Sequence, residues 1–449
     1  MLKKILLVNP PFYRLMGSHF NGLSLGLCYI ASVLKKNGFE VKIYNADYLN
    51  TEKYSDQRSI LEGYDSYKKI LYDFNHPLWI EVKDTIKSYS PDIVGITMLT
   101  GTYKSAENVA RAVKELDCNI DVVVGGVHPT ILPEETIRNN FFDYVVRGEG
   151  EYTFLELVNG VKKENILGLT YIDNTGKIIN NPDRDFIENL DSLPFPSRDL
   201  FLNDTKYYDY GYIMTGRGCP FECTYCASKK IWGRKVRYRS EQNVVDEVKY
   251  VYETFGTNFF YFVDDTFTLN KKRAKKICEL LIDLNLDIKW ICDTRVDTID
   301  EELLRLMKQA GCYRVKIGVE SGSERILKKI KKKITKDKVR KAVSLIKKVG
   351  LDFTIYLLIG FPSETNADAM ETIHFAEELD PTYCSVSILA PYPGTEIYED
   401  LLNQGRKLPK EHWEYFFHQS KDMIIALDID ENIVDELLSL NERGKKHRL

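Results

Sequence analysis

The sequence predicts an α/β protein with an N-terminal parallel sheet, a partial (β/α)6 barrel and a helical C-terminal cap. Two observations predict this class. Short apolar runs alternate with helix-length segments in residues 1–155 and again in 208–402, which is typical of parallel strands joined by helices. The chain has 449 residues, enough for two or three domains of ordinary size. We expect residues 156–207 to link the two α/β domains and residues 403–449 to form the cap.

The composition of the chain argues against some classes of function. Lysine and arginine number 62 and aspartate and glutamate 66, which gives a formal net charge of −4. This balance argues against a nucleic-acid partner, because such binding depends on an excess of positive charge. No apolar run reaches the roughly 18 residues of a membrane helix, and the start of the chain is too polar for a signal peptide. We therefore expect a cytoplasmic protein without a membrane span.

Five short apolar runs in the first domain predict the strands of a parallel sheet: Lys3–Asn9, Val41–Tyr44, Asp92–Met98, Asp121–Val124 and Tyr144–Val146. Apolar residues at helical spacing predict helices over Leu25–Asn37 and Ser105–Leu116. Ligands of such sheets bind beyond the carboxyl ends of the strands. Those ends are rich in small and polar residues here, so we expect a ligand site at that edge.

Residues 156–207 do not continue the alternation of strand and helix patterns. Asp173–Gly176 predicts a hairpin turn and Leu193–Ser197, with two prolines, a stiff connector, so we interpret this stretch as a linker with a small β-element. Six more strands follow, separated by helix-length segments: Tyr212–Met214, Phe259–Val263, Ile288–Ile291, Arg314–Val319, Phe353–Ile359 and Tyr383–Leu389. They suggest a partial barrel whose reactive face lies at the carboxyl ends of its strands. The helical stretch Glu431–Leu440 belongs to the expected cap.

Three of the nine cysteines, Cys219, Cys223 and Cys226, lie close together directly after the first barrel strand. Three thiolates on one glycine-flanked loop can bind a soft metal centre. A structural zinc site normally takes four ligands, and the sequence offers no second cysteine pair or nearby histidine. A four-iron four-sulfur cluster held by three cysteines would leave one iron open for another ligand. The spacing therefore favours a [4Fe-4S] cluster over zinc. The other six cysteines are scattered singly, and we interpret them as buried apolar side chains rather than disulfides.

The triplet Cys-x3-Cys-x2-Cys, with Tyr225 before its last cysteine, resembles the radical S-adenosylmethionine superfamily over roughly residues 210–400. The resemblance implies that the open iron binds the amino and carboxylate groups of S-adenosylmethionine. It also implies that the reduced cluster cleaves this cofactor to methionine and a 5'-deoxyadenosyl radical. Tyr225 is an expected cofactor contact.

Two barrel strands correspond to cofactor-binding strands of this family. Phe262–Phe267 matches its methionine-binding segment, so Asp264 and Asp265 are candidate acceptors for the ammonium group. Alternatively, one of these aspartates caps the following helix. Lys316–Ser323 matches the ribose- and carboxylate-binding strand, and the resemblance makes Glu320 the ribose partner and Ser321 a further cofactor contact.

The remaining strand ends supply the candidate catalytic groups. Arg295 follows the third strand and would hold a carboxylate of cofactor or substrate; a structural ion pair is the alternative. Ile359–Pro362 and Ala390–Thr395 are expected to line the last two strand ends, near the adenine and the substrate. The predicted catalytic residues are Asp265, Arg295 and Tyr392.

The first domain resembles the cobalamin-binding domain that is fused to many radical S-adenosylmethionine enzymes, over about residues 1–155. Two adjacent glycines after the fourth strand would allow backbone contact with the nucleotide loop of cobalamin, and threonine hydroxyls could bond its phosphate and amides. The expected cofactor-binding residues are Ser24, Leu25, Gly26, Thr97, Thr100, Gly125, Gly126, His128, Thr130, Gly148, Glu149 and Gly150. His128 could instead be an ordinary hydrogen-bonding loop residue.

One departure from other cobalamin domains concerns the cobalt. The Asp-x-His-x-x-Gly loop that supplies an axial histidine in methionine synthase and the mutases is absent after the first strand. His19 lies in that loop without the aspartate or the spacing. Bound cobalamin is therefore expected to lack histidine ligation, with water or nothing at its lower face, and to favour transfer of a methyl group.

Two weaker patterns leave alternatives open. The lysine-rich run Lys328–Lys333 is interpreted as a solvated helix face, and docking of an acidic electron donor is the alternative. Aromatic side chains between Tyr48 and Trp79 either pack an inserted helix, which we favour, or shield a substrate cavity.

The two resemblances together imply a methyltransferase. It would move a methyl group from S-adenosylmethionine through methylcobalamin to an unactivated carbon or phosphorus centre, after the 5'-deoxyadenosyl radical removes a hydrogen. Ring formation or rearrangement without net methylation is an alternative, and so is a non-catalytic cobalamin sensor. A methylthiotransferase would carry three further cluster cysteines in its first domain, where only Cys28 and Cys118 are found. Expected partners are a small-molecule or peptide substrate and a flavodoxin- or ferredoxin-type electron donor.

Overall fold

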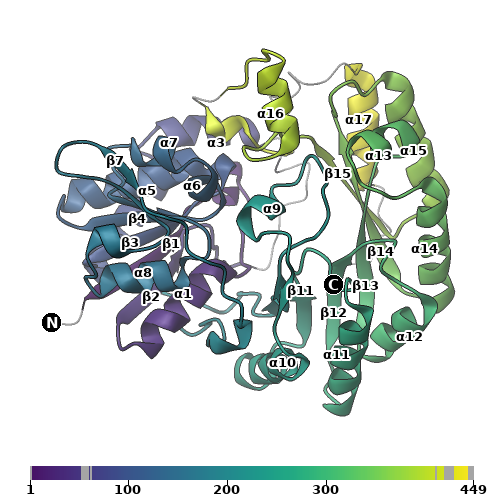
Figure 1. Cartoon of the computed structure of the whole chain (residues 1–449), viewed down its shortest axis with the longest axis horizontal. Helices are drawn as coiled ribbons and strands as arrows, with labels where there is room; N and C mark the ends of the chain where they lie inside the picture. The colour runs from purple at the N-terminus through teal and green to yellow at the C-terminus, as the bar shows by residue number, and fades with distance from the viewer. Residues whose placement is uncertain (1–2, 52–59, 61–62, 410–411, 419–428, 443–449) are drawn as a thin grey trace. The chain divides into compact units, whose positions relative to one another are not determined.

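The computed structural model describes residues 3–51, 60, 63–409, 412–418 and 429–442. They form two compact units (Figure 1). The first comprises Met1–Asp209 with Lys407–Phe416, and the second Tyr210–Arg406 with Phe417–Leu449. Each unit has its own parallel sheet, which confirms the predicted α/β fold class. Within the described ranges, no helix has the length and apolar character needed to cross a membrane.

A seven-stranded sheet in the order β2-β1-β3-β4-β5-β6-β7 forms the centre of the first unit. Its strands are β1 Lys4–Asn9, β2 Glu40–Asn45, β3 Ile93–Thr97, β4 Asp121–Gly125, β5 Tyr144–Val146, β6 Leu169–Ile172 and β7 Ile178–Asn180. The pairs from β2 to β5 are parallel, and β6 and β7 add two antiparallel strands. The order reverses between β1 and β3, and ligands of such sheets bind at this switch point.

Helices cover both faces of this sheet, because its central strands are apolar on both sides; Ile5, Leu6 and Leu7 are fully buried. The helices are α1 Leu25–Lys36, α3 Tyr64–Tyr72, α4 Pro77–Tyr89, α5 Tyr103–Leu116, α6 Val127–Ile131, α7 Pro133–Ile137 and α8 Gly150–Val158, with the 3-10 turns η1 Tyr13–Met16 and η2 Thr100–Thr102. Helix α1 packs against α8, and α4 against α5. Right-handed crossovers place these two pairs on opposite faces.

The stretch expected to link the two domains belongs to the first unit. Strands β6 and β7 extend its sheet, with the predicted Asp173–Gly176 turn between them. Ile43 of the edge strand β2 donates its amide to Leu200 and accepts from Leu202, so residues 200–202 cover that edge. The expected cap, 403–449, is divided: the 3-10 turn η5 Trp413–Tyr415 packs in the first unit. Covering a sheet edge and burying aromatic side chains explain why these segments are not free linkers.

Six strands form the sheet of the second unit, in the order β15-β14-β13-β12-β11-β8, and all neighbouring strands are parallel. They are β8 Tyr212–Ile213, β11 Phe259–Phe262, β12 Lys289–Thr294, β13 Cys312–Glu320, β14 Asp352–Ile359 and β15 Tyr383–Ile388. A separate pair, β9 Gly216–Arg217 and β10 Arg237–Tyr238, follows β8. This sequential order is that of the predicted partial barrel.

Most helices of the second unit form a layer outside this sheet (Figure 1). They are α10 Glu241–Phe255, α11 Lys271–Asp283, α12 Glu301–Gln309, α13 Glu324–Lys329, α14 Lys336–Val349, α15 Asn366–Leu379 and α17 Glu431–Ser439. Two others, α9 Ser228–Ile231 and α16 Glu396–Asn403, lie beside the cysteine loop instead. The alternation in β13 shows the two faces: Val315, Ile317 and Val319 are fully buried, whereas Arg314 and Lys316 are half-buried on the inner face. Helix α17, from the expected cap, packs on α15.

Candidate active site

The three cysteines line one cavity of about 300 Å³ at the carboxyl ends of β11, β12 and β13. Its other walls carry charged and aromatic side chains from these strands and the loops beside them: Phe221, Tyr225, Asp264, Asp265, Asp293, Arg295, Lys316, Glu320, Lys332 and Tyr356. This is the face of the barrel at which the sequence predicts the reactive centre. None of the nine cysteines, all of which lie in described ranges, forms a disulfide. The prediction that the six scattered cysteines are buried is wrong for Cys118, which is exposed.

The cysteine loop is anchored where it leaves β8. Gly218 has φ +112°, and a Cβ there would lie 2.6 Å from the carbonyl oxygen of Lys235, so only glycine fits. Among the described residues, no three Cys, His, Asp or Glu side chains are placed to hold one metal ion. Three thiols that line one cavity fit an iron-sulfur cluster, in which each thiolate binds a different iron.

Asp264 and Asp265 are adjacent in sequence but have different roles in the structure. Asp264 is buried and accepts hydrogen bonds from the amides of Thr215 at 2.6 Å and Gly216 at 3.0 Å, and from the Thr215 hydroxyl. Burial raises the pKa of Asp264. It therefore fixes the start of the cysteine loop. Asp265 is exposed and accepts from the Ser228 hydroxyl at 2.5 Å. Neither caps the following helix, whose N-cap is Asn270.

Glu320 lies in a buried ion pair that the sequence did not reveal. Its Oε1 atom is 2.7 Å from Nζ of Lys332, and that nitrogen also lies 3.2 Å from the Tyr225 hydroxyl. Both charged side chains are less than 10% exposed. A Cβ on Gly318 would approach the Glu320 carboxylate to 2.4 Å, so glycine makes room for the pair. Tyr225 and Glu320, both predicted cofactor contacts, are thus joined through one ammonium group.

The sequence does not single out Lys332, because this residue belongs to a lysine run that is typical of a solvated helix face. Lys328, Lys329, Lys331 and Lys333 of this run are exposed, as expected. Lys331 and Lys333 have positive φ values of 55° and 59°, and this irregular turn directs Lys332 inward. The one signal that the sequence offers is the spacing of Lys332 from Glu320 along the chain. Without the fold, this spacing does not show whether the Lys332 side chain points toward Glu320.

Arg295 lines the cavity and also forms the structural ion pair that was the alternative prediction. Two of its nitrogens lie 2.9 Å from the two carboxylate oxygens of Asp297, and it donates to the carbonyl of Lys332 at 2.9 Å. Its guanidinium carbon stacks 3.6 Å above the ring of Phe221 in the cysteine loop. Tyr392, after β15, is not among the residues that line the cavity.

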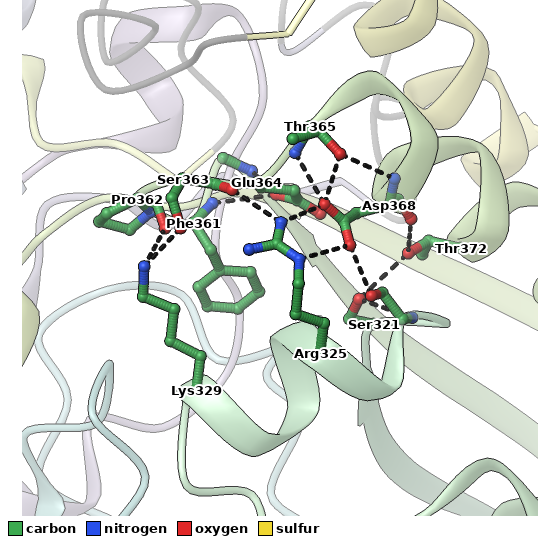
Figure 2. Close-up of polar contacts among 12 residues, drawn as sticks. Ser321, Arg325, Lys329, Phe361, Pro362, Ser363, Glu364, Thr365, Asp368 and Thr372 are labelled. Atoms are coloured by element: carbon green, nitrogen blue, oxygen red, sulfur yellow. Dashed lines mark hydrogen bonds and ion pairs between the residues drawn. The ribbon is translucent and has the colours of Figure 1, made fainter.

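Ser321 is part of a polar network that holds the ends of β13 and β14 together (Figure 2). Its hydroxyl lies 3.2 Å from that of Thr372 on α15, and it accepts from the amide of Ser323. Arg325 on α13 binds the Asp368 carboxylate and donates to the carbonyl of Ser363 at 2.7 Å. The hydroxyl of Ser321, a predicted cofactor contact, therefore has structural partners.

Glu364 is the most buried carboxylate of this network (Figure 2). Its Oε2 accepts from the amides of Gly360 at 2.7 Å and Phe361 at 3.0 Å, whereas its Oε1 has no hydrogen-bond partner among the described residues. Burial raises the pKa of Glu364 to about 7. The group thus shapes the predicted adenine-side loop after β14.

In the first unit, the residues predicted to bind cobalamin gather at the carboxyl edge of β3, β4 and β5. Gly126 has φ +106°, and a Cβ there would lie 2.7 Å from the carbonyl oxygen of Met98. Thr130 donates its hydroxyl to the carbonyl of Gly126 at 2.7 Å and accepts from the amide of Gly148 at 3.0 Å. These bonds join the loops after β4 and β5. Gly125 ends β4 and Thr97 ends β3.

His128 is fully buried in α6, and its Nδ1 lies 3.3 Å from the Thr100 hydroxyl. Burial lowers the pKa of His128 to about 3, so the ring is neutral. Trp413 of η5 packs edge-on against this ring at 5.0 Å and donates to Glu135 at 2.5 Å. His128 and Thr100 therefore bond within the loops. Glu149 is also buried and accepts from the amide of Ile187 at 2.7 Å.

The groups that could contact a corrinoid at this edge are mainly backbone atoms of glycine, because the polar side chains there already bond to neighbouring loops. Gly26 and Gly148 have no atom within 4 Å of the place where a side chain would stand. Ser24 forms the N-cap of α1 without a side-chain hydrogen bond to it, Leu25 begins this helix, and Gly150 begins α8. His19 is buried in the loop after β1, where the sequence predicts no axial ligand.

Comparison with known proteins identifies both domains. The family model described as the radical SAM superfamily matches residues 213–376, and the B12 binding domain model matches residues 18–158. An uncharacterized methyltransferase of Pyrococcus horikoshii is 40% identical over 88% of this chain and 82% of its own length. A cytidylyl-2-hydroxyethylphosphonate methyltransferase of Streptomyces wedmorensis is 29% identical over 86% and 79%. An anaerobic magnesium-protoporphyrin IX monomethyl ester cyclase of Rubrivivax gelatinosus is 30% identical over 72% and 60%.

Among solved structures, the radical S-adenosylmethionine methyltransferase TsrM of Kitasatospora setae, with tryptophan and a cofactor analogue bound, has the same fold. Its TM-score is 0.72 at 20% identity, with 90% of this chain and 76% of that chain covered. The cofactors of the enzyme are a [4Fe-4S] cluster, S-adenosylmethionine and cobalamin. The chain therefore belongs to the cobalamin-dependent enzymes of the radical S-adenosylmethionine superfamily.

Proposed function

We propose that the enzyme is a methyltransferase that moves a methyl group from S-adenosylmethionine through cobalamin to an unactivated carbon or phosphorus centre. The observation that carries this proposal is the cavity in which Cys219, Cys223 and Cys226 face Glu320 and Lys332. The 40% identical relative named as a methyltransferase supports the type of reaction.

The residues of the cavity have complementary tasks in this proposal. Cys219, Cys223 and Cys226 hold the cluster. The Glu320 carboxylate binds the ribose hydroxyls, and Asp265, the exposed member of its pair, accepts the ammonium group of the methionine moiety. Arg295 positions the cysteine loop through its stacking on Phe221. The cluster and S-adenosylmethionine supply a carbon-centred radical that removes a hydrogen atom from the substrate.

The glycine-rich edge of the first sheet holds cobalamin in this proposal. The backbone of Gly26 and Gly148 lies open to a ligand, while Thr130 keeps the loops at Gly126 and Gly148 in place. His128 is neutral and enclosed by Thr100 and Trp413, which supports its role as a loop residue and not as a ligand of cobalt.

The decisive experiment uses S-adenosylmethionine with a labelled methyl group. The protein is purified without oxygen and reconstituted with iron, sulfide and hydroxocobalamin, then incubated with a reductant and candidate substrates. We expect 5'-deoxyadenosine and a product that carries the label. A product without the label contradicts net methylation.

Ring formation or rearrangement is the second candidate, because the Rubrivivax relative is named as a cyclase. In this case 5'-deoxyadenosine forms but the product gains no methyl mass. A non-catalytic cobalamin sensor would form no 5'-deoxyadenosine with any candidate substrate.

The substrate, the electron donor and the location are further parts of the proposal. A flavodoxin- or ferredoxin-type donor is supported by the exposed lysines Lys328, Lys329, Lys331 and Lys333, which offer an acidic partner a positive surface. Nine free thiols support a reducing compartment such as the cytoplasm. The net charge of −4 supports a small molecule or peptide, not a nucleic acid, as the substrate.

A further inference from the structure

Two cations on the inner face of the barrel sheet form no ion pair with the residues that the structure describes. Arg314 and Lys316 are two positions apart in β13, without a register shift between them, so their side chains leave the strand on the same face. Neither forms an ion pair or a side-chain hydrogen bond within the described ranges. The Nε atom of Arg314 is buried and has no hydrogen-bond partner there.

Both cations rest on aromatic rings. The Arg314 guanidinium carbon lies 4.0 Å from the ring centre of Tyr383, and Nζ of Lys316 lies 4.1 Å from that of Tyr261. Such contacts hold a cation in place, but they leave its N–H donors without acceptors. Burial lowers the pKa of Lys316. An anion from outside the described chain would supply the missing acceptors.

The neighbouring carboxylates are engaged elsewhere. Asp293 is the register partner of Lys316 on β12, but it accepts hydrogen bonds from the hydroxyls of Tyr261 and Tyr356. Asp352 is the register partner of Arg314 on β14, and its carboxylate accepts from the Thr382 hydroxyl at 3.3 Å. Asp293 acts electrostatically on Lys316 and offsets part of its charge, but neither acid forms an ion pair with Arg314 within the described ranges.

The other cations that line the cavity are paired. Arg295 is held by Asp297, and Lys332 by Glu320. Lys316 lines the same cavity as the cysteines, and Arg314 lies one step further toward the amino end of the strand. The two cations without an ion pair therefore run from the cavity wall, at Lys316, toward the amino end of β13, at Arg314. In our proposal the cluster lies at the opposite, carboxyl end of this strand.

We propose that Arg314 and Lys316 bind a phosphoryl or carboxylate group of the substrate. The inference rests on the proposed function, because it assigns a substrate subsite inside the same barrel, and it names the substrate class as small anionic molecules. Side chains at positions i and i+2 of a strand start about 7 Å apart and can converge on one anion. A guanidinium fork and an ammonium group together match the geometry of such oxygens.

The test is a calorimetric titration of the holoenzyme, reconstituted with iron, sulfide and hydroxocobalamin, with inorganic phosphate, with acetate and, separately, with S-adenosylmethionine. The variants are the double change Arg314→Met with Lys316→Met and, as the matched control, Lys272→Met on the exposed face of α11. We expect the double variant to bind the preferred anion at least about tenfold more weakly, because charged hydrogen bonds are lost. The control should bind it within about twofold of the wild type, and S-adenosylmethionine affinity should change by less than about twofold in both.

Three results overturn the proposal. A parallel loss of S-adenosylmethionine affinity assigns the cations to the carboxylate of that cofactor. If the wild type and the double variant bind the anion equally, Arg314 and Lys316 have no role in binding it. If neither anion binds the wild type saturably, the proposed subsite does not exist. Lys316→Arg, which retains the charge, should retain binding, and an unchanged circular dichroism spectrum excludes misfolding. Formation of 5'-deoxyadenosine is measured on the same samples. A protein that forms 5'-deoxyadenosine but binds no anion contradicts the subsite alone, whereas a protein that forms none contradicts the proposed function.

Discussion

The two sites use their polar side chains in opposite ways. In the barrel cavity, charged groups face the open space, among them Asp265, Lys316 and the Glu320–Lys332 pair. At the edge of the first sheet, Thr100, Thr130 and His128 bond to neighbouring loops instead. Glycine backbone is what remains accessible there. In our proposal, the barrel therefore recognises its ligands by charge, whereas the first sheet recognises its ligand by the shape of its backbone.

Replacing a cysteine of the triplet should abolish the activity of the barrel site and leave cobalamin binding by the first sheet unchanged. Cys219→Ser, Cys223→Ser or Cys226→Ser should each lower 5'-deoxyadenosine formation at least about a thousandfold, because the three thiolates act as a unit. Iron content should fall, while the affinity for hydroxocobalamin stays within about twofold of the wild type. Iron analysis and the absorption spectrum check this. Cys118→Ser changes an exposed cysteine and is the matched control. Wild-type turnover in the triplet variants contradicts the cluster assignment.

A backbone change should affect only the first sheet. Gly126→Ala forces a side chain into the φ +106° conformation and against the carbonyl of Met98, and we expect a loss of about 2–4 kcal/mol of stability and weaker cobalamin binding. Gly160→Ala also has a positive φ but open space around it, and should cost about 1 kcal/mol without a change in cobalamin affinity. Chemical unfolding and titration with hydroxocobalamin measure both effects. Equal losses in the two variants would count against the loop assignment.

The buried ion pair offers a test of recognition by charge. Lys332→Gln leaves the Glu320 carboxylate buried without its partner, and we expect a cost of about 3 kcal/mol that is divided between stability and S-adenosylmethionine affinity. Lys333→Gln removes an exposed partner of Glu222 from the same run and should cost less than about 1 kcal/mol. Denaturant unfolding and cofactor titration provide the measurements. If the two variants behave alike, Lys332 has no special role.

The smallest effect is a pH dependence. Burial raises the pKa of Glu364 from 4.5 to about 7, so the folded state holds a proton that the unfolded state releases. This contribution is complete below pH 4.5 and is lost as the pH rises toward 7, a decrease of about 2–3 kcal/mol. Glu364→Gln should remove this slope from the wild-type unfolding curve, whereas Glu371→Gln, an exposed change on α15, should retain it. An unchanged slope in Glu364→Gln would show that another group titrates.

Much of the fold follows from short-range patterns. All eleven predicted strands are present, with ends shifted by a few residues, because apolar runs between helices are a local signal. The linker and the cap could not be placed in this way. Residues 200–202 pair with β2, and Trp413 packs against His128, through contacts between segments that are far apart in the chain.

The chemistry of this enzyme follows from local sequence, because three cysteines at fixed spacing on one loop are already close together before the chain folds. Local sequence also identifies the strand ends that carry Asp265 and Glu320, since parallel strands bring their carboxyl ends to one edge. Which polar groups face a ligand depends on the packed chain. Lys332 turns inward from a solvated run, Asp264 turns to the backbone of the cysteine loop, and the Nε atom of Arg314 has no hydrogen-bond partner among the described residues. These outcomes depend on which distant carboxylates, rings and amides lie nearby, and local sequence does not encode such distances.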